Sequence, residues 1–311
     1  MNTALYSPQA CRLHAMGPGH PECPERLDAI LDHLRATGLD ALLAHRDAPL
    51  AQAEQLARAH SARYVAEMSE LMGRCAEAGR AQAVDPDTTV AAHTQEAALR
   101  AAGAAVAATD AVLAGEVRNA FCAVRPPGHH ATREAAMGFC FFNNVAVAAR
   151  HALDVHGLER VAVIDFDVHH GNGTEDIVAG DARILMCSFF QHPLYPYSGT
   201  EPRGANMVNV PLAPYTRGPA VREAIEREWV PALEAHQPQM IFISAGFDAH
   251  REDELGQMGL VEADYAWITR RLVELAERHA QGRIVSCLEG GYHLGALARS
   301  VAVHLRELAG L

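Results

Sequence analysis

The stretch Val161-Ala-Val-Ile-Asp-Phe-Asp-Val-His-His-Gly-Asn-Gly173 sets the fold class that we expect. Its first half is short and apolar, as in a strand that lies buried in a parallel sheet. Polar residues follow at once. Because alternate side chains of an extended chain point the same way, Asp165, Asp167 and His169 are expected on one face. Asp167 and His169 can grip one cation there, since a buried carboxylate needs a partner charge or a metal.

Five further short apolar runs occur along the chain, and helices are expected between them at Val145–Val155, Pro219–His236 and Glu262–Ala280. Strands that alternate with helices are typical of an α/β fold, with a central parallel sheet and helices on both faces. Ligands of such sheets bind beyond the carboxyl ends of the strands, so the active site is expected there. The five runs are Ala120–Val124, Ile184–Phe189, Val208–Pro211, Met240–Ala245 and Ile284–Leu288.

The N-terminal third is expected to be mostly helical, over Pro24–Thr37, Ala51–Gly79 and the Ala-rich stretch Thr94–Gly115. No repeat, linker or low-complexity block divides the 311 residues, so we expect a single domain over residues 1–311. No apolar run reaches the roughly 18 residues of a membrane span. The N-terminus also lacks the features of a secretion signal. We therefore expect a cytoplasmic protein that does not enter a membrane.

The formal net charge of −12 argues against nucleic-acid binding, which favours a basic stripe, and is compatible with a cationic substrate or partner. All 26 basic residues are arginine, which excludes chemistry that uses a Schiff-base lysine. The seven cysteines are odd in number and form no CxxC pair, so we expect neither a disulfide framework nor a thiolate zinc site. The sequence leaves open whether the chain forms a homo-oligomer.

Polar loops follow four of the expected strands and so meet at one edge of the sheet. Asp248, in one of them, can supply a third metal ligand beside Asp167 and His169. Two carboxylates and one imidazole leave open coordination positions, as in a catalytic metal site, and suit zinc, ferrous iron or cobalt. For the Asp167–His169 pair alone, a capped turn with solvated acids is the alternative. The four loops are residues 125–130, 167–173, 246–248 and 289–292.

Candidates for acid–base chemistry lie in two of these loops. His129 and His130 follow a stiff Pro-Pro-Gly turn. A metal hydrolase needs a base for the attacking water and an acid for the leaving amine, and adjacent histidines can supply both, with Asp165 orienting one of them. Tyr292 follows two glycines and can donate to a developing oxyanion, while Phe139 can line a channel. Taken singly, the histidine pair is better explained as an ordinary surface pair, and the tyrosine is equally compatible with a surface position.

In this order the motifs resemble the class II histone deacetylase branch of the arginase/deacetylase superfamily. They span nearly the whole chain, and the set is specific although each motif alone is weak. The resemblance implies the arginase/deacetylase fold and a zinc amidohydrolase that uses metal-activated water to remove acyl groups from lysine-like amines. The motifs are His20-Pro-Glu-Cys-Pro-Glu-Arg-Leu27, Arg125-Pro-Pro-Gly-His-His130, Gly138-Phe-Cys-Phe-Phe-Asn-Asn144, Asp165-Phe-Asp-Val-His-His-Gly-Asn-Gly173, Ser244-Ala-Gly-Phe-Asp248 and Glu289-Gly-Gly-Tyr292.

The resemblance also implies two cation sites. By position, Asp167, His169 and Asp248 would bind the zinc ion. Members of the family hold a monovalent cation, usually potassium, beside the zinc. The residues that match this second site, several of them through backbone oxygens, are Asp165, Asp167, His169, Ser188 and Phe189.

The catalytic residues implied by the resemblance are five. His129 would be the general base, paired with Asp165, and His130 the second histidine, paired with Asn172. The asparagine supports the class II branch, because class I members carry an aspartate there. Tyr292 would polarise the acyl carbonyl together with zinc. Class II members with a histidine at that position are poor on acetyl-lysine, so the tyrosine implies a competent deacetylase.

For the substrate, the resemblance implies that Phe139, next to Gly138, and Tyr197 flank the aliphatic chain. Asp87 matches a rim residue that hydrogen-bonds the substrate backbone. Relatives specific for polyamines carry an acidic gatekeeper after the third zinc ligand, whereas this chain has Leu255 there, with Glu254 beside it. We therefore expect an acyl-lysine peptide or protein as the substrate, with an acylated polyamine or another acylated amine as the alternative.

Overall fold

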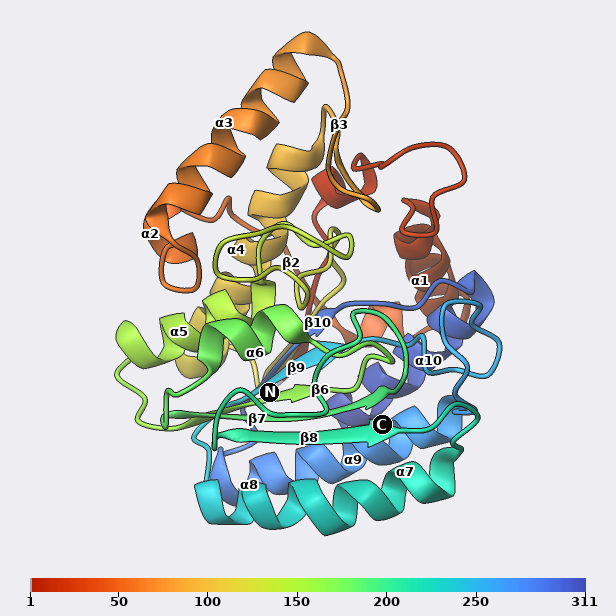
Figure 1. Ribbon diagram of the computed structural model, residues 1–311. Coiled ribbons are helices and arrows are strands. Elements are labelled where there is room, and N and C mark those ends of the chain that lie inside the picture. The colour runs from red at the N-terminus through yellow and green to blue at the C-terminus, as the bar shows by residue number, and fades with distance from the viewer. Residues whose placement is uncertain (1) are drawn as a thin grey trace.

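The computed structural model describes residues 2–311 and has a parallel eight-stranded sheet at its centre (Figure 1). The strands lie in the order β2-β1-β5-β10-β9-β6-β7-β8. The six apolar runs of the sequence are all strands of this sheet, which confirms the expected fold class. The strands are β1 (Thr3–Tyr6), β2 (Ala44–Arg46), β5 (Asn119–Cys122), β6 (Val161–Asp165), β7 (Ile184–Gln191), β8 (Met207–Leu212), β9 (Ile241–Ala245) and β10 (Ile284–Leu288).

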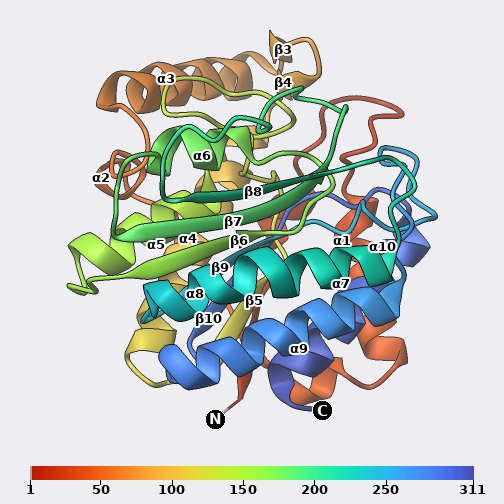
Figure 2. The ribbon, with the colours of Figure 1, turned by 60° about the horizontal axis from the view of Figure 1, so that its bottom comes forward.

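Helices cover both faces of the sheet. In Figure 2, α7, α8 and α9 lie across the near face, while α4 and α5 lie behind the sheet. Helix α1 packs against α10, which packs in turn against α9. None of the described helices is long and apolar enough to cross a bilayer. The helices are α1 (Glu25–Ala36), α2 (Ala53–Leu56), α3 (Ala62–Ala78), α4 (Thr94–Leu113), α5 (Asn144–Asp154), α6 (Asn172–Val178), α7 (Gly218–Ala224), α8 (Val230–His236), α9 (Glu262–His279) and α10 (Leu294–Ala309).

The N-terminal third differs from the expectation of a mostly helical region. It supplies β1 and β2, which extend one edge of the sheet, and the hairpin of β3 (Gln82–Asp85) and β4 (Thr88–Val90). The helix expected over Ala51–Gly79 is interrupted between α2 and α3. Ser61 causes the restart, because its side chain accepts a hydrogen bond of 3.1 Å from the Tyr64 amide and so caps α3.

The four strands that carry the polar loops are neighbours in the middle of the sheet, in the order β5-β10-β9-β6. All their residues are buried. Because every pair within this sheet is parallel, their carboxyl ends meet at one edge. The sheet therefore brings together loops that lie far apart in the sequence.

Candidate active site

Three potential metal ligands meet where β6 and β9 end. One nitrogen or oxygen atom from each of Asp167, His169 and Asp248 lies within 4.8 Å of the other two. The Nδ1 atom of His169 is 3.0 Å from Asp167 Oδ1 and 3.2 Å from Asp248 Oδ2. Both carboxylates are fully buried. The fold therefore brings together the three residues that we expected to lie close to one another.

The electrostatics of this cluster fit a bound divalent cation. Burial and the charge of Asp167 raise the pKa of Asp248 to about 7. The Oδ2 atom of Asp248 is buried and accepts no hydrogen bond from the described residues. Gly290 keeps the space open, because a Cβ atom there would lie 1.9 Å from that oxygen, and its amide donates to Asp167 over 2.8 Å. A cation between the two carboxylates and the imidazole would give the unpaired oxygen a partner. It would also offset the repulsion between the two carboxylates.

Each residue of the histidine pair is oriented by a hydrogen bond at Nδ1. His129 Nδ1 lies 3.0 Å from Asp165 Oδ2, and His130 Nδ1 lies 2.7 Å from Asn172 Oδ1. The centres of the two rings are 4.0 Å apart. Gly138 is needed beside them, because it has a φ of +55° and a Cβ atom there would lie 2.5 Å from the His130 ring. The Nε2 atoms are thereby left for chemistry.

The pair has opposite pKa shifts. Burial alone would lower the pKa of His129, but the carboxylates of Asp167 and Asp165 outweigh burial and raise it to about 10. Burial lowers the pKa of His130 well below its usual value, and the positive charges of His129 and His169 lower it further. The positions of the surrounding charges therefore make the two adjacent histidines chemically different.

Glu289 has a structural connection to this pair that the sequence did not reveal. Its buried Oε2 accepts hydrogen bonds from the amides of Gly128, at 2.7 Å, and His129, at 3.1 Å. Its Oε1 accepts from Ser244 Oγ at 3.2 Å. The carboxylate thus holds the backbone of the loop that carries the histidines. Only its place in the Glu-Gly-Gly-Tyr motif signalled it in the sequence.

Arg26 supports the loop that carries Tyr292, and the sequence alone did not reveal this role. Arg26 donates to the carbonyl oxygens of Glu289, at 2.5 Å, and Gly291, at 2.6 Å, and its guanidinium lies 4.9 Å from the centre of the Tyr292 ring. The buried Glu22 pairs with Arg26 over 3.2 Å. The N-terminal motif therefore fixes the loop that ends in Tyr292.

A pocket of about 240 Å³ leads down to these residues. Asp87, Gly138 and Phe139 line it, whereas Tyr197 does not, and contact of these residues with a substrate stays a prediction. Tyr197 is 73% exposed, whereas the ring of Tyr195 lies 5.2 Å from the His130 ring and forms the wall. The pocket is lined by Asp87, His130, Gly138, Phe139, His169, Leu194, Tyr195, Leu255 and Tyr292.

Comparison with known proteins identifies the family. The model of the histone deacetylase domain matches residues 20–308. The chain belongs to the histone deacetylase family. It is 40% identical to the histone deacetylase-like amidohydrolase of Pseudomonas aeruginosa, over 99% of this chain and 86% of the relative. The crystal structure of the HDA15 HD domain superposes with a TM-score of 0.91 at 31% identity, covering 99% of this chain and 88% of that chain.

More distant members of the family differ in their names and lengths. The probable deacetylase of Archaeoglobus fulgidus is 38% identical over 91% of this chain and 80% of its own. The polyamine deacetylase HDAC10 of Homo sapiens is 38% identical over 93% of this chain but 45% of its own length. Membership makes this chain a hydrolase of the deacetylase and amidohydrolase type, and it implies an acylated substrate and a metal cofactor.

The residues that match the family's potassium site are neighbours in the structure. Asp165 on β6 is directly opposite Ser188 on β7, and Phe189 follows it. Ser188 and Phe189 are buried. A monovalent cation at this place remains a prediction.

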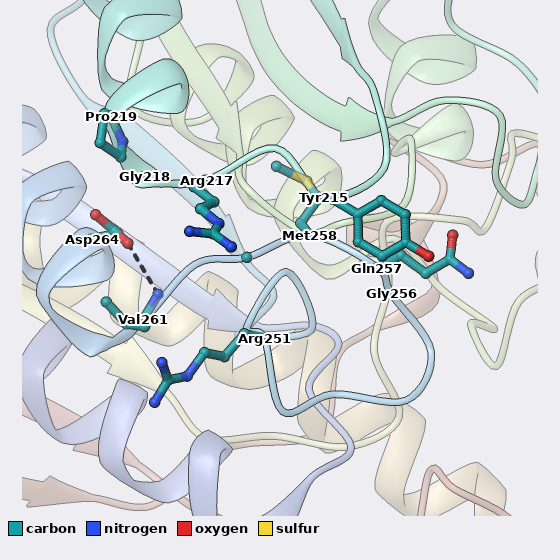
Figure 3. Close-up of a pocket in the computed structure, with 11 residues that line it drawn as sticks. Tyr215, Arg217, Gly218, Pro219, Arg251, Gly256, Gln257, Met258, Val261 and Asp264 are labelled. Atoms are coloured by element: carbon teal, nitrogen blue, oxygen red, sulfur yellow. Dashed lines mark hydrogen bonds between the residues drawn. The ribbon is translucent and has the colours of Figure 1, made fainter.

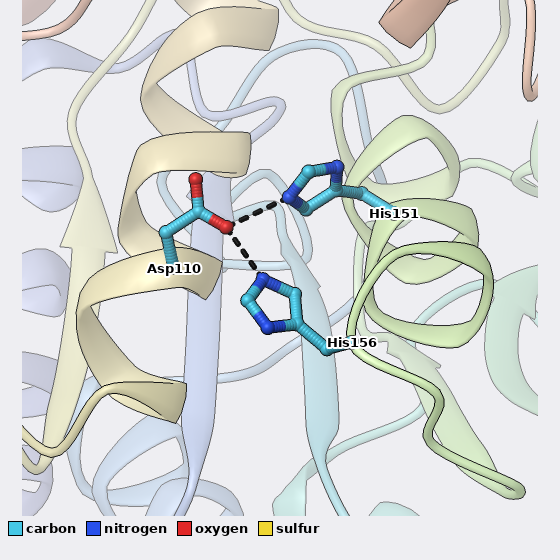
Figure 4. Close-up of side chains that lie close together, drawn as sticks. All are labelled: Asp110, His151 and His156. Carbon is cyan, nitrogen blue, oxygen red and sulfur yellow. Dashed lines mark hydrogen bonds and ion pairs between the residues drawn. The ribbon is translucent and has the colours of Figure 1, made fainter.

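Two other features of the molecule lie outside this site. A larger pocket of about 650 Å³ contains none of the candidate site residues (Figure 3). A second cluster joins Asp110 to His151 and His156, whose Nε2 atoms lie 2.7 and 2.6 Å from the same carboxylate oxygen (Figure 4). His151 Nδ1 is buried and has no partner among residues 2–311, so a metal on its Nε2 would leave an Nδ1–H group unsatisfied. We assign this cluster a structural role.

Proposed function

We propose that this protein is a zinc-dependent deacetylase that hydrolyses the amide of N-acetyl-lysine or a related N-acyl amine. The observation that carries the proposal is the meeting of Asp167, His169 and Asp248 with the histidine pair and Tyr292 at the foot of one narrow pocket. Each group needed for amide hydrolysis then has a candidate: an electrophilic cation, a base, an acid and an oxyanion donor.

Asp167, His169 and Asp248 would hold the metal ion. When bound, the ion supplies Lewis-acid polarisation of the acyl carbonyl and of the attacking water. Zinc suits two carboxylates and one imidazole, and ferrous iron or cobalt could replace it. Potassium beside Asp165 and Ser188 would be a structural ion.

His129 would act as the base. Its Nδ1 is engaged with Asp165, so its Nε2 faces the place where water would be held, near Asp167 at 3.9 Å. The charge of Asp167 is the largest influence raising the pKa of His129. A divalent cation on Asp167 would offset that charge, and His129 could then be neutral before it takes a proton. His130, held by Asn172, would assist protonation of the leaving amine.

Tyr292 would donate its hydroxyl to the carbonyl oxygen as negative charge develops there. Arg26 holds the backbone on both sides of Gly290 and packs against the phenol ring, which limits how far the hydroxyl can move. A donor fixed before the reaction costs little reorganisation in the transition state.

The side chains that line the pocket favour a substrate with an uncharged aliphatic chain. Phe139, Leu194, Tyr195 and Leu255 line the pocket, together with Asp87 from the turn between β3 and β4. Because Leu255 provides no charge for a cationic chain, an acyl-lysine fits better than an acylpolyamine. The alternative rests on the similarity to the relative named polyamine deacetylase HDAC10.

Turnover of an acetyl-lysine peptide by protein supplied with zinc or ferrous iron tests the proposal. We expect kcat/KM for the peptide to exceed that for acetylated putrescine or spermidine. A clear excess for the polyamines would favour the alternative. Tight binding of the peptide without hydrolysis would indicate an acyl-lysine binding protein and would contradict both.

A further inference from the structure

The larger pocket lies against the same loop as the catalytic pocket, and we call it the side pocket. Leu255 faces the catalytic pocket, while the next two residues, Gly256 and Gln257, face the side pocket. A single loop therefore separates them. The side pocket is lined by Tyr215, Arg217, Gly218, Pro219, Arg251, Gly256, Gln257, Met258, Gly259, Val261 and Asp264.

Backbone hydrogen bonds fix two arginines on opposite sides of this loop. Arg217 pairs with Gly259 in a parallel bridge. On the other side, the Arg251 amide donates to Leu260 over 2.9 Å. In Figure 3 the two guanidinium groups lie on either side of the segment that leads to Val261, and both line the side pocket.

The carboxylate that lines the side pocket, and two others that directly follow lining residues in the sequence, already have partners. Asp264 is buried and accepts from Arg222, at 2.6 Å, and from the Val261 amide, at 3.0 Å. Glu252 and Glu262 both pair with Arg299. In contrast, neither Arg217 nor Arg251 has a carboxylate within ion-pair distance among residues 2–311. The side pocket therefore presents two unmatched positive charges on a protein whose net charge is −12.

We propose that the side pocket binds acidic side chains of a polypeptide substrate, close in sequence to the acylated lysine. Guanidinium groups pair well with carboxylates, and unmatched surface charge steers an oppositely charged ligand. Tyr215 is 75% exposed beside the arginines and offers a contact surface. This inference rests on the proposed function and specifies which acyl-lysine sequences the enzyme prefers.

The spacing follows from the shared loop. Two packed layers of chain, with the side chains between them, lie about 10 Å apart, and we take this distance for the separation of the two pockets. An extended peptide advances about 3.3 Å per residue. The acidic residue is therefore expected about three positions from the acyl-lysine.

The test compares two acetyl-lysine peptides that differ only in glutamate or glutamine two to four positions from the modified residue. We expect the wild-type protein to prefer the glutamate peptide by about 5- to 10-fold in kcat/KM, through KM, and the preference to fall with salt. In the Arg217→Ala/Arg251→Ala protein the ratio should fall toward one. Arg306→Ala removes an arginine of α10 that has no ion pair within the described part of the chain, and it should leave the ratio at its wild-type value.

Equal kcat/KM for the two peptides in the wild-type protein would overturn the inference, as would a double variant that keeps the preference. If neither peptide is hydrolysed, the proposed function fails. Fluorescence anisotropy with the labelled glutamate peptide then tests the side pocket separately. Tighter binding to the wild-type protein than to the double variant supports it, and equal binding contradicts it.

Discussion

Replacing Glu289 by alanine should lower both the free energy of unfolding and kcat. Replacing it by glutamine should change both quantities much less. The carboxylate accepts from two buried amides, at 2.7 and 3.1 Å, and from one hydroxyl, at 3.2 Å. Leaving a buried donor unsatisfied costs about 1–3 kcal/mol, and water that enters the vacated space offsets part of this. The hydroxyl of Ser244 can rotate, so the two amides decide the cost. We expect alanine to lower the free energy of unfolding by about 2–4 kcal/mol.

The amides in question belong to Gly128 and His129, so their release also moves the histidine loop. A displacement of about 1 Å in a catalytic group costs on the order of 10²-fold in rate. Glutamine can turn its carbonyl oxygen to both amides and its NH₂ group to Ser244, which keeps all three hydrogen bonds. Its expected cost is below about 1 kcal/mol.

Denaturant unfolding and kcat on an acetyl-lysine peptide, measured on Glu289→Ala and Glu289→Gln side by side, separate these effects. The account requires that glutamine restore most of the activity lost with alanine. If both variants lose activity equally, the carboxylate charge and not its hydrogen-bond geometry is what matters. If alanine is as stable and as active as the wild type, Glu289 does not hold the loop.

Three further changes probe other parts of the site. Tyr292→Phe should keep a full metal equivalent but lower kcat by about 10²-fold or more, and unchanged turnover would remove its hydroxyl from the chemistry. Tyr195→Ala should raise KM for an acetyl-lysine peptide several-fold, while Tyr197→Ala should leave KM as it is; the reverse result would restore Tyr197 to the wall. Burial raises the pKa of Glu289 to about 7, so the stability that this group contributes is present below its unfolded value near 4.5 and declines as pH rises through 7. In metal-depleted protein, Glu289→Gln should therefore gain stability relative to the wild type between pH 5 and pH 8, and a constant difference in unfolding free energy would refute this.

Much of the fold followed from the sequence, because buried parallel strands are short and almost wholly apolar. Val161–Asp165 is a clear case. Strands β1 and β2, at one edge of the sheet, were not predicted in this way. Strand β2 has only three residues, and two of them, His45 and Arg46, are exposed, so it shows neither an apolar run nor an alternation. Its place in the sheet depends on its pairing with β1, a contact between distant segments.

The candidate site was foreseeable where side chains meet beyond the ends of the strands, as with Asp167, His169 and Asp248, and not where a side chain holds the backbone of another loop. His129 and His130 stand in one motif. Glu289 and Arg26, in contrast, act on backbone groups far away in the sequence, and side-chain type alone does not reveal such partners. Tyr195 and Tyr197 lie two residues apart, but Tyr197 has a positive φ of 59° and its side chain is exposed. No sequence pattern predicts this difference.

The most direct test of the central claim is a zinc titration of protein stripped by a chelator, with acetate release from an acetyl-lysine peptide as the readout. The account predicts that activity is absent without metal, rises linearly to one equivalent of zinc and then stays level. His169→Ala should show no such rise, because it lacks one of the three ligands. Full activity in the stripped protein, or an identical titration curve for His169→Ala, would contradict the assignment of Asp167, His169 and Asp248 as the catalytic metal site.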